Sequence, residues 1–176
     1  SDLLVGAPFA DPGGRESAGV GYVVFGKPGG EAVELLDVQA GLGGFAIHGI
    51  AQFDFSGWSV SGAGDVNGDG LSDLLVGARW ADPGGRDLAG ESYVVFGKPG
   101  GEAVELSDVA AGSGGLAIRG REDGNASGAS LSGAGNVNGD GLADLLIGAP
   151  GADPGGKDGA GESYVVFGKP GGEPVE

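Results

Sequence analysis

The chain has 176 residues, including 43 glycines and no cysteine, and its formal net charge is −16 from 25 acidic and 9 basic side chains. This length allows one domain with a sizeable core. The 40% hydrophobic content excludes a disordered linker, and the absence of a three-residue glycine period excludes collagen. The acidity argues against nucleic acid and anionic membrane surfaces as partners, and no apolar run is long enough for membrane insertion.

The sequence repeats itself every 71 residues. Phe25-Gly-Lys-Pro-Gly-Gly30 returns at 96–101 and again at 167–172. A repeat of this length is a supersecondary unit that buries its core against its neighbours. We divide the chain into a partial repeat and two full repeats, at 1–34, 35–105 and 106–176. Because the chain contains no Met and begins inside a motif, we expect a piece of a longer protein or a processed product.

Each full repeat is predicted to contain four strands, A to D, in the order B-C-D, A-B-C-D, A-B-C along the chain. In the middle of the chain, strand A covers about 58–65, strand B 73–78, strand C 91–96 and strand D 115–120. Apolar and polar residues alternate in strand D, which is typical of an outer, half-exposed strand. The stretch 35–40 can form one helical turn, and 103–113 reads as a polar connection. Tandem four-stranded antiparallel units predict an all-β fold of β-propeller blades, with about two and a half repeats present. The small residues of strand A fit an inner strand, where blades crowd together.

The stretch between strands A and B carries the clearest chemistry. Oxygen-bearing side chains stand at alternate positions, followed by a glycine and a closing Asp. Calcium takes about 6–8 oxygen ligands, mostly carboxylates, carbonyls and water. The first loop offers the side chains of Asp65, Asn67, Asp69 and Asp73 and the carbonyl of Leu71. The second offers Asn136, Asn138, Asp140 and Asp144 and the carbonyl of Leu142, and Asp2 is the last ligand of a third, truncated copy.

These loops are not EF-hands. An EF-hand needs a Glu at its twelfth position and a following helix, whereas Val76 and Ile147 occupy that position within apolar runs that read as strands. Ordinary turn chemistry explains a single Asp-Asn-Gly cluster, but two copies in register favour a metal site. Because Asn136 replaces the leading carboxylate, we expect the second loop to bind calcium more weakly than the first.

Loop and strands together resemble the FG-GAP repeats of the integrin alpha-chain β-propeller and of related bacterial secreted proteins. The resemblance is carried by Phe55-Ser-Gly-Trp-Ser at the start of strand A, by the loop 65–73, and by Gly-Ala-Pro at 6–8 and 148–150. The middle copy departs from this pattern with Arg79, and Ala126 stands where the first motif has Phe. The resemblance implies a propeller of about seven blades with calcium between strands A and B of several blades, an extracellular location, and roles in adhesion or assembly.

The expected function is that of a secreted, non-enzymatic, calcium-binding repeat protein at the cell surface, with a structural, adhesive or filament-forming role. Two and a half blades leave open sheet edges, so the expected partners are further repeats of a longer chain or other copies, joined by strand pairing. A cell-surface protein or glycan is a further expected partner.

Two alternatives remain: a lectin-like or integrin-like recognition propeller, and the propeller part of a secreted hydrolase. The acidic residues recur with the repeat, whereas an active site is normally singular, so we expect no enzyme. Trp58 and Trp80 are not repeated and can either line a recognition surface or fill variable packing. His48, the only histidine, is expected to be exposed on strand D.

Overall fold

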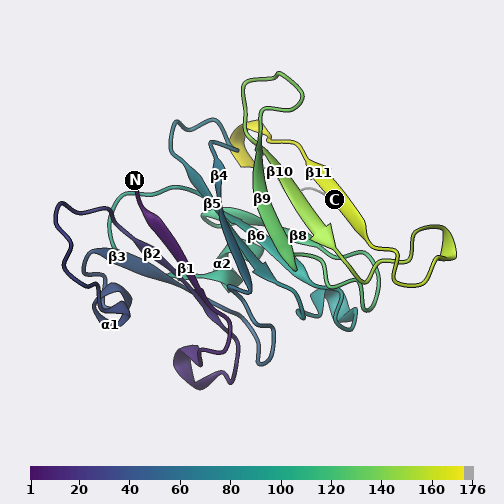
Figure 1. Ribbon diagram of the computed structural model, residues 1–176, viewed down its shortest axis with the longest axis horizontal. Coiled ribbons are helices and arrows are strands. Elements are labelled where there is room, and N and C mark those ends of the chain that lie inside the picture. The colour runs from purple at the N-terminus through teal and green to yellow at the C-terminus, as the bar shows by residue number, and fades with distance from the viewer. Residues whose placement is uncertain (173–176) are drawn as a thin grey trace.

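The computed structural model describes residues 1–172 and is all-β, as expected (Figure 1). Its strands are β1 (Leu3–Ala7), β2 (Val20–Val24), β3 (Gly44–His48), β4 (Ser59–Gly64), β5 (Asp73–Ala78), β6 (Glu91–Val95), β7 (Val104–Glu105), β8 (Gly115–Arg119), β9 (Ser130–Gly135), β10 (Asp144–Ala149) and β11 (Glu162–Val166). The two short α-helices are α1 (Leu35–Gln39) and α2 (Leu106–Ala110), and 3₁₀ turns form at Pro12–Gly14, Pro83–Gly85, Pro154–Gly156 and Pro170–Gly172. None of the described helices is long and apolar enough to cross a membrane.

The strands form three sheets that follow one another along the chain, from purple through teal to yellow in Figure 1. The strand orders are β1-β2-β3-β7, β4-β5-β6-β8 and β9-β10-β11. Every pair is antiparallel except β3 with β7. Three successive sheets of this kind have the architecture of propeller blades.

Adjacent sheets bury their apolar faces against one another, as repeats that cannot close a core alone must do. Between the first and second sheets lies one cluster of buried side chains: Val23, Phe45, Ile47, Val76, Ala78, Ala81, Tyr93, Val95, Leu106 and Val109. Between the second and third sheets lies another: Ala63, Val66, Leu75, Val94, Leu116 and Leu145. Most of the core therefore lies at junctions between two sheets. A third cluster packs α1 on the first sheet: Val20, Tyr22, Val24, Val38 and Ala46.

The first strands of the second and third sheets, β4 and β9, lie against each other. A Cβ atom at Gly133 of β9 would lie 2.8 Å from the carbonyl oxygen of Gly62 in β4, closer than side-chain carbon atoms come to a carbonyl. Glycine is needed here for close approach, in agreement with the prediction that strand A is the crowded inner strand.

The outer part of the repeat differs from the sequence prediction. The connection expected at 103–113 contains α2 and also β7, which pairs in parallel with β3 through Ile47↔Val104 and His48↔Glu105. Helix α1 covers β3 as well, with Val38 buried against it. Four of the five residues of β3 are therefore buried, so the prediction of a half-exposed outer strand is wrong for this sheet.

Candidate metal centre

The loop between β4 and β5 is shaped by its own polar side chains. Asp65 accepts hydrogen bonds at Oδ1 from the N–H groups of Gly68 (2.7 Å) and Asp69 (3.1 Å), and at Oδ2 from Gly70 (2.9 Å). Gly70 has φ of +86°, in the left-handed region that favours glycine. The spacing Asp-x-x-Gly-Asp-Gly thus folds the chain around the first carboxylate.

The next two polar side chains continue the same pattern. Oδ1 of Asn67 accepts from the N–H of Asp69 (2.9 Å), and Oδ1 of Asp69 accepts from the N–H of Leu71 (2.7 Å). The amide Nδ2 of Asn67 also donates to Oδ2 of Asp69 (3.0 Å). The side chains predicted as ligands from 65 to 69 are thus brought together within one turn.

The loop between β9 and β10 repeats this geometry with one difference. Oδ1 of Asn136 accepts from the N–H groups of Gly139 (2.8 Å) and Asp140 (3.1 Å), and Asn138 and Asp140 accept as their counterparts do. However, the second terminal atom of Asn136 is an NH₂ group, which cannot accept a hydrogen bond as Oδ2 of Asp65 does. The second loop therefore has one fewer carboxylate and lacks the bond that Gly70 donates to Asp65, while the N–H of Asn138 donates an additional bond to Oδ2 of Asp144 (3.4 Å).

The closing Asp of each loop has a role that the sequence did not reveal. Asp73 is fully buried, and its carboxylate accepts from the N–H of Val66 (2.9 Å) and from the N–H of Gly97 (2.9 Å), just beyond β6. Asp144 is also buried and accepts in the same way from Val137 (2.6 Å) and Gly168 (3.0 Å). Each carboxylate therefore joins its loop to the end of strand C.

Asp2 occupies the same place in the first sheet. Its Oδ1 accepts from the N–H of Gly26 (2.9 Å), which follows β2 as Gly97 follows β6. The recurring bond gives a structural reason for the repeated Asp, whether or not it also binds a metal.

The electrostatics of the two buried carboxylates differ. Burial raises the pKa of Asp73; its two backbone hydrogen bonds oppose this, and the nearby carboxylates of Asp69 and Asp65 raise the pKa further. For Asp144, burial also raises the pKa, but the N–H groups of Gly168, Val137 and Asn138 outweigh it and leave the pKa below its ordinary value. The first loop thus concentrates more negative charge, and no ion pair within residues 1–172 neutralises it.

The donor set suits a calcium ion, although the loop oxygens are held by backbone N–H groups. Among residues 1–172, no three Asp, Glu, His or Cys side chains converge closely enough to form a metal site by themselves. Oδ2 of Asp65 and both carboxylate oxygens of Asp69 and Asp73 nevertheless accept one hydrogen bond each and keep a second lone pair. Within the same residues no donor bonds the carbonyl oxygens of Leu71 or Leu142. Three carboxylates, one amide oxygen and one free carbonyl within nine residues are the hard oxygen ligands that calcium prefers.

The first loop also connects two sheets. The backbone carbonyl oxygens of Asp65, Val66 and Asn67 accept hydrogen bonds from the segments that flank the strands of the third sheet. The donors are the N–H groups of Ala143 (2.8 Å), Lys169 (3.1 Å) and Gly171 (3.1 Å). The conformation of this loop is therefore coupled to the junction between the second and third sheets.

An aromatic cluster lies at the other end of β5 from this loop. The guanidinium of Arg79 stacks 3.3 Å from the ring centroid of Trp58 and 4.8 Å from that of Trp80. Phe55 packs edge-on against Trp80 at 4.8 Å and against Phe9 at 5.4 Å. The rings of Trp58, Trp80 and Phe9 remain partly exposed. We name these five residues the aromatic platform.

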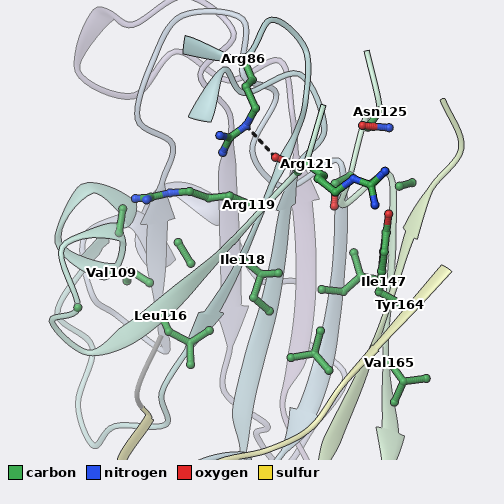
Figure 2. Close-up of a pocket in the computed structure, with 17 residues that line it drawn as sticks. Arg86, Val109, Leu116, Ile118, Arg119, Arg121, Asn125, Ile147, Tyr164 and Val165 are labelled. Atoms are coloured by element: carbon green, nitrogen blue, oxygen red, sulfur yellow. Dashed lines mark hydrogen bonds between the residues drawn. The ribbon is translucent and has the colours of Figure 1, made fainter. Parts of the chain in front are cut away.

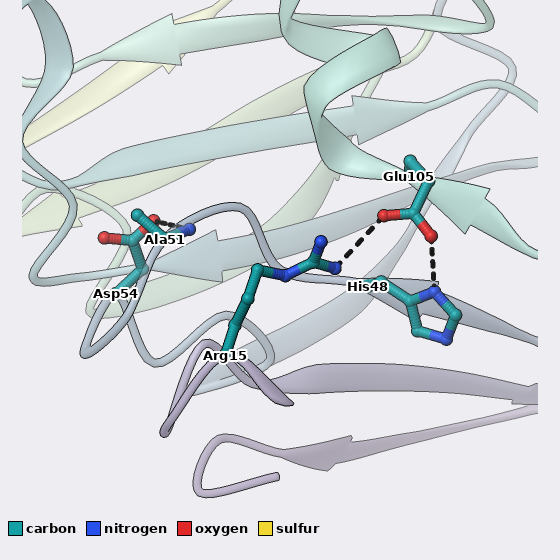
Figure 3. A network of polar contacts seen from close by, with 5 residues as sticks. All are labelled: Arg15, His48, Ala51, Asp54 and Glu105. Atoms are coloured by element: carbon teal, nitrogen blue, oxygen red, sulfur yellow. Dashed lines mark hydrogen bonds and ion pairs between the residues drawn. The ribbon is translucent and has the colours of Figure 1, made fainter. Parts of the chain in front are cut away.

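A second polar group holds β7 against the rest of the first sheet (Figure 3). Glu105 of β7 accepts from Arg15 (3.2 Å) and lies 2.6 Å from Nδ1 of His48, whose side chain is only 16% exposed. The prediction of an exposed His48 is therefore wrong, because β7 covers it. Nearby, Oδ2 of Asp54 accepts from the N–H of Ala51 (3.0 Å), and burial, aided by two other carboxylates, raises the pKa of Asp54 to about 6.

Comparison with known proteins assigns the repeat. The family model described as FG-GAP repeat matches residues 56–95 and 127–166, and each match runs from the start of strand A through the loop to strand C. The chain carries FG-GAP repeats. Each FG-GAP match contains one complete candidate loop, so the loops described above are part of the repeat itself.

The chain is also similar to integrin alpha chains. It is 30% identical to Integrin alpha pat-2 of Caenorhabditis elegans over 160 residues, which cover 84% of this chain and 12% of that protein. It is 35% identical to Integrin alpha-PS2 of Drosophila melanogaster over 137 residues, which cover 72% of this chain and 9% of that protein. It is also 35% identical to Integrin alpha-5 of Xenopus laevis over 82 residues, which cover 47% of this chain and 7% of that protein. The chain therefore spans 12% or less of the length of these relatives.

Proposed function

We propose that this chain is a calcium-stabilised segment of an extracellular or cell-surface FG-GAP propeller with a structural, adhesive or assembly role. The observation that carries the proposal is the array of oxygen atoms between strands A and B, built in the same way in both matched repeats. The first site comprises Asp65, Asn67, Asp69, Asp73 and the carbonyl of Leu71. The second comprises Asn136, Asn138, Asp140, Asp144 and the carbonyl of Leu142.

Bound calcium would supply positive charge where the first loop holds three carboxylates without a cationic partner among residues 1–172. A ligand that binds only the folded chain adds about 2.7 kcal/mol per site at a hundredfold excess over its Kd. Because the first loop is bonded to the third sheet, part of this stabilisation would reach the junction between sheets. The role of the loops is thus mechanical, and no catalytic step is assigned to the chain.

Thermal unfolding of the full chain in calcium and in chelator tests this function. We expect chelation to lower the melting temperature by about 5–10 °C per site, given ~2–4 °C per kcal/mol for a chain of this size. Asp69→Asn should lose part of that shift. Asp158→Asn is the matched control, because Asp158 is exposed, lies outside both loops and removes the same charge. Equal melting curves in calcium and chelator would contradict the proposal.

The aromatic platform favours a second function, recognition of a glycan or an acidic ligand. Arg79 forms no ion pair among residues 1–172, and its Nε is buried without a hydrogen-bond partner. Phe53, in the loop that carries Phe55 and Trp58, is 48% exposed at φ of +66°, where the next repeat has Gly124. A bulky residue held in the left-handed region marks strain, which tends to occur at functional sites.

A glycan array tests this second function directly. Trp80→Ala should abolish any hit, because it removes one of the two rings that hold the guanidinium of Arg79. Phe167→Ala is the control, since Phe167 is an exposed aromatic residue remote from the platform in sequence and outside its contacts. Binding that survives Trp80→Ala would assign recognition to another surface.

A further inference from the structure

Each candidate loop contains an Asn followed by a Gly, at 67–68 and at 138–139. The backbone nitrogen of the following residue can attack the side-chain amide of an Asn, which closes a succinimide ring and releases ammonia. Glycine favours this attack because it has no Cβ to shield its nitrogen. Gly68 is exposed, so water can reach the ring. The loop lies outside the cavity between the second and third sheets, which Figure 2 shows lined by side chains such as Leu116, Ile147 and Tyr164.

Three groups around Asn67 are placed to assist this reaction. Oδ1 of Asp65 accepts the N–H of Gly68 at 2.7 Å and is in position to take the proton that the attacking nitrogen loses. The N–H of Asp69 donates to Oδ1 of Asn67 (2.9 Å), where negative charge develops as the ring closes. Nδ2 of Asn67, the leaving group, donates to Oδ2 of Asp69 (3.0 Å). The loop therefore places a base, an oxyanion donor and a partner for the leaving group around one amide.

The peptide between Asn67 and Gly68 is also held from outside the loop. The N–H of Gly171 donates to the carbonyl oxygen of Asn67 (3.1 Å). A hydrogen bond to a peptide oxygen draws electron density away from the peptide nitrogen, which stabilises that nitrogen once it loses its proton. The attacking peptide is thus fixed at both ends, by Asp65 at its N–H and by Gly171 at its oxygen.

The second loop repeats the arrangement without the base. The N–H of Asp140 donates to Oδ1 of Asn138 (3.0 Å), and Nδ2 of Asn138 donates to Oδ2 of Asp140 (2.8 Å). The N–H of Gly139, however, donates to Oδ1 of Asn136 (2.8 Å), an amide oxygen that does not take up a proton as a carboxylate does. Asn138 is exposed, whereas Asn67 is half-buried. Exposure and the position of the base therefore predict opposite orders of reactivity.

We propose that the first loop promotes deamidation of its own Asn67, with Asp65 as the base. The nitrogen of Gly68 bonds to Cγ of Asn67 while its proton moves to Asp65. The bond from Cγ to Nδ2 then breaks, and ammonia leaves with a proton returned through Asp65 and solvent. Water adds to one carbonyl of the ring and opens it, leaving aspartate or isoaspartate at position 67. Nothing is oxidised or reduced.

The product changes the loop irreversibly. The amide donor that bonds Oδ2 of Asp69 becomes an oxygen that repels it, and isoaspartate also adds a methylene group to the backbone. The carbonyl oxygens of Val66 and Asn67 bond the segment after β11, so the change would be felt at the junction between the second and third sheets. The reaction occurs once in each chain and turns over no substrate. The inference goes beyond the proposed function and does not rest on calcium binding.

Peptide mapping by mass spectrometry tests the inference on the full chain, incubated in chelator and in water labelled with heavy oxygen. Because a positioned base contributes about 10²–10⁴-fold, conversion at position 67 should be about tenfold or more faster than at position 138, with uptake of the label. Asp65→Asn should remove this difference. Asp158→Asn removes an exposed charge outside both loops and should leave it unchanged. Equal rates at the two positions, or faster conversion of the exposed Asn138, would overturn the proposal.

A second variant tests the base by gain of reactivity, in case Asp65→Asn disturbs the loop. Asn136→Asp places a carboxylate on the N–H of Gly139 and should accelerate conversion at position 138, again by about tenfold or more. The unmodified chain, incubated in parallel, is the reference for this rate. An unchanged rate at position 138 would overturn the assignment of the base. Since every rate is measured in chelator, the outcome is independent of whether the loops bind calcium.

Discussion

Asp54 provides the most quantitative prediction, because the chain contains its own control. Asp54 is 8% exposed, and burial is the main cause that raises its pKa from 3.8 to about 6, with Asp82 and Glu91 adding to the effect and the N–H of Ala51 opposing it. The matching residue of the next repeat is Asn125, which accepts the same kind of backbone bond (2.9 Å) without carrying a charge. Asp54→Asn therefore keeps the hydrogen bond and removes only the ionisation.

The sign and size of the effect follow from linkage. Because the pKa is higher in the folded chain than in the unfolded chain, the folded chain binds the proton more tightly, and stability falls as pH rises from about 4 to about 6. The shift corresponds to about 3 kcal/mol at ~1.4 kcal/mol per pH unit. Partial screening by nearby solvent reduces the expected loss to about 1–2 kcal/mol.

Guanidinium unfolding, followed by tryptophan fluorescence between pH 4 and 8, measures this effect. The difference in free energy of unfolding between Asp54→Asn and the unmodified chain should grow from near zero at pH 4 to about 1–2 kcal/mol in favour of the variant at pH 7. Asn125→Asp should lower the stability at pH 7 relative to pH 4. A pH-independent difference for Asp54→Asn would show that its burial does not suppress ionisation.

Three other substitutions test packing and metal affinity. Leu106→Ala should lower the free energy of unfolding by about 2–4 kcal/mol, because Leu106 is fully buried. Its repeat counterpart Leu35 is only half-buried, so Leu35→Ala should lower it by less than half as much in the same denaturation assay. Gly133→Ala should destabilise the chain by about 1–3 kcal/mol, because the added Cβ would meet the backbone of the opposing strand. Gly62→Ala is the control and should be nearly neutral, because a Cβ at Gly62 meets nothing within 4 Å. Equal effects of the two substitutions would contradict the close approach. Asn136→Asp should raise the calcium affinity of the second loop in calorimetry, since it restores the missing carboxylate, and an unchanged affinity would refute the expected ranking of the two loops.

Much of the fold follows from local pattern because strands and loops recur at a fixed interval. The boundaries of β5 coincide with the predicted strand at 73–78, since Asp73 and Ala78 sit between a polar loop and a turn. The crowding of strand A was also foreseeable from its glycines. In both cases the sequence signal lies within a few residues of the element it specifies.

Other features depend on residues far apart in the chain and could not be foreseen. Strand β7 is only two residues long, and it forms because β3 of the first sheet offers a free edge. The low exposure of the His48 side chain follows from that pairing. Helix α2 was foreseeable in part, since Leu106-Ser-Asp-Val repeats the spacing of Leu35-Leu-Asp-Val, where a helical turn was expected.

The candidate site shows the same division. The oxygen atoms of Asp65, Asn67 and Asp69 lie in one turn as the spacing predicts. The burial of Asp73 and its bond to Gly97 could not be predicted, because they require strand C to return beside the loop. The aromatic platform likewise joins residues from three separate loops.

Calcium stoichiometry tests the central claim most directly. Isothermal titration of the full chain, after removal of metal, should show two ions bound per chain, with the tighter site lost in Asp69→Ala and the weaker site lost in Asp140→Ala. The double variant should bind none, while Asp158→Asn should still bind two. Absence of saturable binding, or a stoichiometry that the double variant leaves unchanged, would show that these loops are turns held only by their own hydrogen bonds.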